Sequence, residues 1–103
     1  MVVKFTNQYL QDLYENKKVA GKPKFNDVII KKFRHKIQIL EYAESLQQIY
    51  DFKSLHFEKL SGDLDGYYSC RVDIKYRLIL SIGIDTILVK EVIIVEDLTN
   101  HYD

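Results

Sequence analysis

Five polar residues of this 103-residue chain are the candidates for chemistry, namely Lys59, Arg71, Arg77, His101 and Tyr102, with His35 and His56 less clearly placed. The two arginines carry the clearest signal, because paired guanidinium groups can grip a phosphate through several charge-assisted hydrogen bonds. A histidine or tyrosine near a chain end is more often a surface or packing residue than a reactive one. By spacing alone, His101 is therefore a weak catalytic candidate.

The arginines lie in two runs that alternate between two faces, which is typical of half-buried strands. After the turn dipeptides Gly62-Asp63 and Asp65-Gly66, the first run places Tyr68, Cys70 and Val72 on one face and Tyr67, Ser69 and Arg71 on the other. After Asp73-Ile74-Lys75, the second run places Tyr76, Leu78, Leu80 and Ile82 on one face and Arg77, Ile79 and Ser81 on the other. The two runs predict a β-hairpin.

The register of this hairpin follows from keeping its apolar face intact, since a slip of one residue would turn every side chain over. Pairing Val72 with Tyr76 keeps that face apolar throughout. The same register sets Arg71 directly opposite Arg77, where like charges cost roughly 0.2–1 kcal/mol relative to a neutral pair. We therefore expect an anion between them. A phosphate is one candidate, and intramolecular bridges to Asp or Glu are the other.

Composition excludes several classes of protein. The 103 residues suit one domain, residues 1–103, and 47% hydrophobic with 29% charged residues is ordinary for a soluble globular chain. We expect no signal peptide and no membrane span, because no apolar run is long enough.

The single cysteine on the hairpin's apolar face suits a reducing cytoplasm. His35, His56, His101 and Cys70 show no ligand spacing, so no metal and no cofactor is expected.

The charges are unevenly distributed although the net charge is zero. Most of the excess positive charge lies between Lys17 and Lys36, where the only acidic residue is Asp27. The basic residues of this stretch are Lys17, Lys18, Lys22, Lys24, Lys31, Lys32, Arg34 and Lys36. They could form an electrostatic footprint for nucleic acid, or simply the solvated face of a helix.

Helical and strand patterns follow one another along the chain. We expect an edge strand at Val2 to Phe5, helices from Thr6 or Asn7 to about Asn16 and from Asn26 or Asp27 to about Glu44, and a short helix capped by Ser45. Residues 54–60 look extended, Gly83 to Thr86 is expected to turn, and Ile87 to Val95 is expected to be a central strand. The pattern predicts an α+β fold with helices on one face of three or four antiparallel strands.

The ordered set of motifs resembles the RelE/ParE toxin superfamily, and within it the HigB or plasmid-maintenance killer branch. The residues that carry the likeness are Tyr9-Leu10-x-x-Leu13-Tyr14, Leu55 to Asp63, Gly66, Ser69, Arg71-Val72, Tyr76-Arg77-Leu78 and Asn100-His101-Tyr102. The resemblance spans nearly the whole chain. It implies helices lying against a curved antiparallel sheet whose concave face binds the substrate backbone.

The resemblance also implies a function. Such a toxin belongs to a type II toxin–antitoxin system and is a ribosome-dependent endoribonuclease that cleaves mRNA without a metal. Arg71 and Arg77 would hold the phosphate, His101 would act as general acid or base, and Tyr102 would stack on a base or share proton transfer. The expected RNA contacts are Lys59, Lys75, Lys31 and Lys32. The expected partners are the ribosome, mRNA and a cognate antitoxin of helix-turn-helix, HigA-like type, all in the cytoplasm.

Two other interpretations stay open. The chain could be a non-nuclease member of the same superfamily, comparable to the gyrase-targeting ParE-like toxins. It could also be an inert interaction module whose arginines are neutralised by Asp73, Asp97 or a partner. The departure from the family pattern that matters most is the neutral net charge, because toxins of this kind are usually basic.

Overall fold

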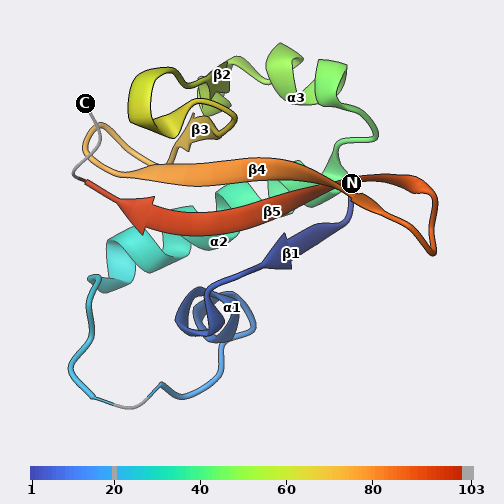
Figure 1. Ribbon diagram of the computed structural model, residues 1–103. Coiled ribbons are helices and arrows are strands. Elements are labelled where there is room, and N and C mark those ends of the chain that lie inside the picture. Colours follow the sequence, from blue (N-terminus) through green and yellow to red (C-terminus); the bar gives the residue numbers. More distant parts are fainter. Residues whose placement is uncertain (20, 101–103) are drawn as a thin grey trace.

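The computed structural model describes residues 1–19 and 21–100, in which helices pack against a five-stranded mixed sheet (Figure 1). The strand order across the sheet is β1-β5-β4-β3-β2. The predicted α+β class is confirmed. In chain order the elements are β1 (Val3–Phe5), α1 (Gln8–Tyr14), α2 (Asp27–Tyr42), α3 (Leu46–Asp51), the 3-10 turn η1 (Lys53–Leu55), β2 (Glu58–Lys59), the 3-10 turn η2 (Gly62–Leu64), β3 (Tyr68–Arg71), β4 (Arg77–Asp85) and β5 (Lys90–Thr99).

The helices begin where the sequence predicts, because a polar side chain caps each of them. The side-chain oxygens of Asn7, Asn26 and Ser45 accept hydrogen bonds from the backbone N–H groups of Leu10 (3.1 Å), Ile29 (2.9 Å) and Gln48 (3.2 Å). Each cap accepts a hydrogen bond from a backbone N–H that has no acceptor within its own helix. One such bond stabilises a helix by about 1 kcal/mol. Within the described residues, no helix has the length and hydropathy needed to cross a bilayer.

The core lies between the helices and one face of the sheet. The apolar stripe of α2 is buried, as its spacing predicts, and it packs on alternate residues of the hairpin. The buried residues from these elements are Ile29, Phe33, Ile37, Leu40, Cys70, Leu78 and Leu80. Burial raises the pKa of the Cys70 thiol to about 12, so this thiol stays neutral over the physiological range.

The sheet differs from the prediction in its size and in the direction of one strand. β1 forms the expected edge strand, but it pairs in parallel with β5, with Val3 beside Ile93 and Phe5 beside Val95. β2 adds a short antiparallel strand at the opposite edge. The direction of β1 could not be predicted locally, because its partner lies at the far end of the chain.

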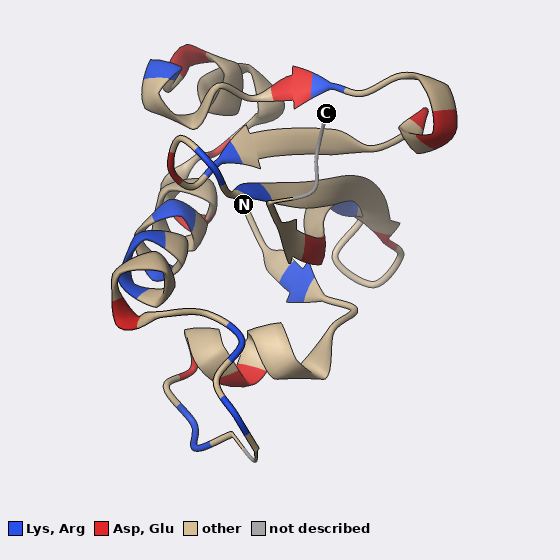
Figure 2. Cartoon of the chain, turned by 90° about the vertical axis from the view of Figure 1, so that its left-hand side faces the viewer, with Lys and Arg blue, Asp and Glu red and all other residues tan. Residues whose placement is uncertain are grey.

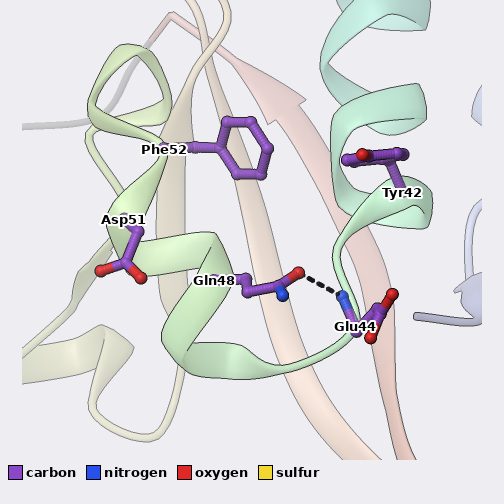
Figure 3. Close-up of a pocket in the computed structure, with 5 residues that line it drawn as sticks. All are labelled: Tyr42, Glu44, Gln48, Asp51 and Phe52. Carbon is purple, nitrogen blue, oxygen red and sulfur yellow. Dashed lines mark hydrogen bonds between the residues drawn. The ribbon is translucent and has the colours of Figure 1, made fainter.

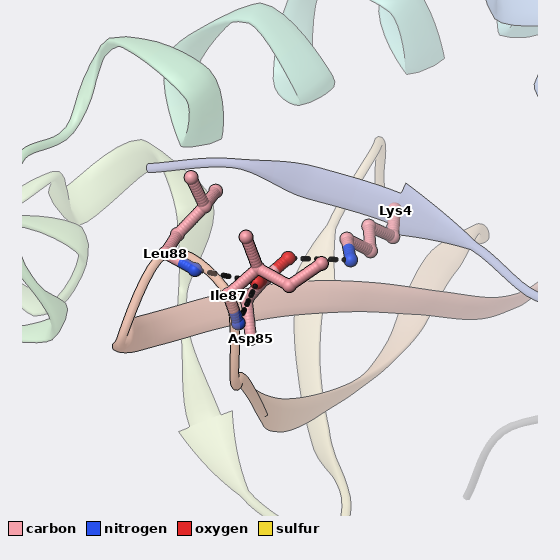
Figure 4. Close-up of polar contacts among 4 residues, drawn as sticks. All are labelled: Lys4, Asp85, Ile87 and Leu88. Atoms are coloured by element: carbon pink, nitrogen blue, oxygen red, sulfur yellow. Dashed lines mark hydrogen bonds and ion pairs between the residues drawn. The ribbon is translucent and has the colours of Figure 1, made fainter.

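The turn between β4 and β5 lies further along the chain than predicted. β4 continues through Asp85, and the apolar residues that favoured a buried strand form an exposed turn instead. Ile87 is 90% exposed, Leu88 51% and Val89 80%. Asp85 holds this turn, since its carboxylate accepts hydrogen bonds from the backbone N–H groups of Ile87 (3.0 Å) and Leu88 (2.8 Å) (Figure 4).

Gly83 lies within β4 rather than in the expected turn. A Cβ atom at this position would come within 2.9 Å of Cδ1 of Ile94, on the neighbouring strand. The glycine therefore makes room for a cross-strand side chain, a role that the sequence does not distinguish from a turn.

Candidate functional site

Arg71 and Arg77 are directly opposite residues of β3 and β4, as the predicted register requires. The next pair along the hairpin, Cys70 and Leu78, is fully buried against the helices. Because side chains alternate along a strand, the two guanidinium groups project from the other side of the sheet. We call the side of the sheet that carries Arg71 and Arg77 the guanidinium face.

His56 lies beside the first of these arginines. Its backbone is left-handed, with φ +45° and ψ +47°, and it ends η1 by donating its N–H to the carbonyl of Lys53 at 3.1 Å. Nε2 of His56 lies 3.4 Å from Nη1 of Arg71. A left-handed conformation is uncommon for a residue with a Cβ, and such residues are enriched at functional sites. The turn therefore places an imidazole next to a guanidinium group.

Glu58 lies beside the second arginine. It is the residue of β2 that pairs with Ser69 of β3, and its Oε1 lies 4.0 Å from Nη1 of Arg77. The Glu58 side chain is 53% exposed, so at this distance the ion pair contributes little to stability. A half-exposed carboxylate thus stands at the edge of the guanidinium face.

These residues form two adjacent rows across the sheet. Arg71, Arg77 and Thr99 are paired in one row, which His56 extends through its contact with Arg71. Glu58, Ser69, Ile79 and Asp97 are paired in the next. The rows bring two cations, an imidazole and two carboxyl groups onto one surface.

Two buried polar groups of this surface have no hydrogen-bond partner among the described residues. Ser69 was expected on the exposed face of its strand but is fully buried. Within residues 1–19 and 21–100, neither the Ser69 hydroxyl nor Nε of Arg71 has a hydrogen-bond partner. An unsatisfied buried donor costs about 1–3 kcal/mol.

The two arginines differ in their contacts with carboxylates. Arg77 has Glu58 at the limit of an ion pair, while Arg71 forms no ion pair with a carboxylate in the described part of the chain. Arg71 therefore carries a guanidinium group whose polar contact is an imidazole rather than an anion.

The structure does not bring the predicted lysines to the arginines. Lys59 pairs with Tyr68, so its side chain leaves β2 on the side opposite to Glu58. Lys75 lies in the β3–β4 turn and lines a separate hollow with Tyr76 and Asn100. His101 and Tyr102 lie outside the described residues.

Lys31 and Lys32 belong to the exposed side of α2, where they line a shallow hollow with Val28 and His35. Figure 2 shows the basic residues of α2 following one another along this helix. Because α2 packs on the face of the sheet away from Arg71 and Arg77, the sheet separates the two basic surfaces.

Arg34, part of the basic stretch, is used internally. Its Nε donates to the carbonyl of Leu13 at 2.7 Å and its Nη2 donates to Oδ1 of Asn16 at 3.0 Å. These bonds tie α2 to the end of α1, so this guanidinium group supports the fold and is less available to a ligand.

Glu58 was not among the predicted site residues, and His56 was named only as a less clearly placed candidate for chemistry. The signal that could have found them is the alternation in Leu55 to Glu58, because Leu55 and Phe57 are buried while His56 and Glu58 are exposed. In the described residues, no group of three or more His, Cys, Asp or Glu side chains is placed to hold a metal ion.

One family profile matches most of the chain. The profile describes the RelE-like toxin of the type II toxin–antitoxin system HigB, and it matches residues 3–93. A search of curated proteins found no match.

Solved structures share the fold over nearly the whole chain. A YoeB/ParE toxin from Agrobacterium tumefaciens has a TM-score of 0.57 at 15% identity, covering 99% of this chain and 100% of that one. YafQ from E. coli strain BL21(DE3) has a TM-score of 0.58 at 12% identity, with coverages of 96% and 91%. The YoeB–YefM complex from Staphylococcus aureus has a TM-score of 0.58 at 22% identity, with coverages of 99% and 98%. At these identities the likeness shows the fold alone.

Proposed function

The chain belongs to the RelE-like, HigB-type toxins of type II toxin–antitoxin systems, and we propose that it is a ribosome-dependent endoribonuclease that cleaves mRNA. The observation that carries this proposal is the opposed pair Arg71 and Arg77, flanked by His56 and Glu58. A phosphodiester is the anion that this set of groups can both bind and cleave.

The reaction needs no metal. The 2′-hydroxyl oxygen attacks the adjacent phosphorus, its proton passes to a base, and the bond from phosphorus to the 5′ oxygen breaks as an acid protonates the leaving oxygen. A 2′,3′-cyclic phosphate and a 5′-hydroxyl result. Arg71 and Arg77 would bind the phosphate oxygens and offset the charge that develops on them, which is usually the dominant contribution.

Proton transfer falls to the groups around the arginines. The exposed Glu58 carboxylate can accept the 2′-hydroxyl proton, and the His56 imidazole can give or take one. His101 and Tyr102 remain proposed proton-transfer residues. Their support is that Thr99, the last residue of β5, pairs with Arg77, so the chain reaches the guanidinium face just before these two residues.

The other basic residues would contact RNA away from the scissile phosphate. Lys31 and Lys32 lie on the helix side of the sheet, where they could meet the phosphate backbone of ribosomal RNA. Lys59 and Lys75 lie at the margins of the hairpin and could extend the RNA contact there. In this arrangement the ribosome orients the mRNA, and the residues of the guanidinium face cleave the phosphodiester bond.

The proposed partner is a cognate antitoxin. The solved complex of YoeB with YefM is a structure of this fold with a second protein bound. By analogy we propose an antitoxin for this chain, of the helix-turn-helix, HigA-like type.

The test is cleavage of mRNA on programmed ribosomes. We expect the purified protein to cut ribosome-bound mRNA, to leave a 2′,3′-cyclic phosphate, and to spare a substrate with a 2′-deoxynucleotide at the cleavage position. Arg77→Gln should slow cleavage by about 10²–10³-fold, the usual effect of removing one group that stabilises transition-state charge. Lys90→Gln is the matched control. It also removes one positive charge, but at the start of β5, whereas Arg77 pairs with the last residue of that strand.

Other outcomes would redirect the proposal. Growth arrest with intact mRNA and DNA damage signalling would favour a gyrase-targeting toxin. Neither growth arrest nor cleavage, with the fold intact, would favour an inert interaction module.

A further inference from the structure

A cavity of about 300 Å³ lies between the end of α2 and α3. It is lined by Tyr42, Glu44, Gln48, Asp51 and Phe52, none of which belongs to the guanidinium face (Figure 3). The function proposed above leaves this cavity unused.

Two aromatic rings form its apolar walls. The ring centroids of Tyr42 and Phe52 are 6.5 Å apart, and the ring planes meet at 75°. Tyr42 is 77% exposed, although burying an aromatic ring is strongly favourable. Figure 3 shows both rings bordering the same space above Gln48. The face of an aromatic ring attracts a cation.

The charged groups of the lining are all acidic. In the described part of the chain, neither Glu44 nor Asp51 forms an ion pair, and no lysine or arginine lines the cavity. Within the described residues, the Asp51 carboxylate accepts only a hydrogen bond from the Gln47 side-chain amide, at 3.1 Å. The negative charge of this cavity is therefore not balanced from within.

The cavity wall is also held in place before a ligand arrives. The side-chain oxygen of Gln48 accepts a hydrogen bond from the backbone N–H of Glu44 at 2.8 Å, and Ser45 caps α3 beside it. The loop that carries Glu44 is thus tied to the helix that carries Gln48, Asp51 and the following Phe52. A fixed wall lowers the entropy cost of binding.

We propose that this cavity binds the guanidinium or ammonium group of an arginine or lysine side chain presented by a protein partner. Aromatic faces and carboxylates together suit an organic cation, which needs both an apolar and an anionic contact. A cavity of this size accepts one side chain rather than a folded segment.

The surroundings favour a protein as the source of the cation. A second hollow of about 680 Å³ shares Tyr42 and Glu44 with the first and extends to Lys90 and Glu91. These two residues begin β5, directly after the exposed apolar turn that contains Ile87 and Val89. Contiguous exposed apolar residues of this kind mark protein contacts. A free amine would make no use of them.

The first experiment titrates the ¹⁵N-labelled protein with N-acetyl-arginine amide and follows backbone amide shifts. We expect saturable shifts confined to residues 42–52. The uncharged isostere N-acetyl-citrulline amide should not produce them. Tyr42→Leu should weaken binding by about two- to fivefold, and Glu44→Gln with Asp51→Asn by a similar factor for each charge removed. Asp65→Asn, an exposed carboxylate in another loop, is the matched control.

The second experiment separates a protein source from a free amine. A peptide with arginine flanked by leucines should bind more tightly than the arginine amide, and Ile87→Ser with Val89→Ser should remove that gain without affecting the amide. The cation site would be overturned if the citrulline compound binds as tightly as the arginine amide. It would also be overturned if the folded wild-type protein shows no saturable shift with the arginine amide. Binding of spermidine as tight as that of the peptide would overturn the protein source.

Discussion

Nε2 of His56 lies 3.4 Å from Nη1 of Arg71, although the two residues belong to different segments and His56 is held there by a left-handed backbone. If the imidazole transfers a proton, His56→Asn should lower ribosome-dependent cleavage by about 10²–10⁴-fold. Asparagine tolerates the left-handed conformation, so the fold should persist. A fully active His56→Asn protein would remove His56 from the mechanism.

Replacing Arg71 should change stability and activity in opposite directions. Arg71→Gln removes the like-charge repulsion with Arg77, so the free energy of unfolding should rise by roughly 0.2–1 kcal/mol. Cleavage should fall, because one phosphate-binding group is lost. Urea denaturation and the cleavage assay on the same preparation check both effects. A loss of stability would show that Arg71 has stabilising contacts within the protein, which would contradict its role as an anion-binding group.

Glu58→Gln tests the proposed proton acceptor. An amide of the same shape keeps the strand pairing with Ser69 but cannot accept the 2′-hydroxyl proton, so cleavage should fall by about 10²–10⁴-fold while RNA affinity stays similar or rises. Asp97→Gln, a change in the same row on β5, is the comparison. Equal loss in both variants would point to a general charge effect on RNA binding.

The buried thiol of Cys70 should be inert and should make stability depend on alkaline pH. Its pKa is raised from 9.0 to about 12 by burial. Above pH 9.0 the thiol ionises in the unfolded chain and not in the folded one, so the free energy of unfolding should fall as pH rises towards 12. Cys70→Ala should lose this part of the slope. Rapid labelling of the native protein by a thiol reagent would contradict the burial.

The contact between Lys4 and Asp85 should matter at acid pH. The hydrogen bond from Nζ of Lys4, at 2.8 Å, and those from the backbone of Leu88 and Ile87 hold the pKa of Asp85 below its usual 3.8 (Figure 4). The stabilisation is complete above pH 3.8 and is lost as pH falls through the lowered pKa. The melting temperature of Asp85→Asn should therefore depend less on pH in that range than that of the wild type. Glu91→Gln, on the next strand, should keep the wild-type dependence.

Local patterns in the sequence determined the hairpin and the helices. The alternation of Cys70 and Leu78 with Arg71 and Arg77 has a period of two, and only one register keeps its apolar side intact. The caps Asn7, Asn26 and Ser45 act on amides three residues away. These interactions join residues that are close in the sequence, so the local sequence determines them.

Only the tertiary structure decided what surrounds the arginines. His56 and Glu58 reach them because β2 pairs with β3 across an intervening loop, and Lys31 and Lys32 are kept from them because α2 packs on the other face of the sheet. β1 runs parallel to β5, and the apolar Ile87 to Val89 form a turn because Asp85 binds their backbone. Pairings between distant segments depend on how the whole chain packs, so the local pattern of apolar residues does not predict them.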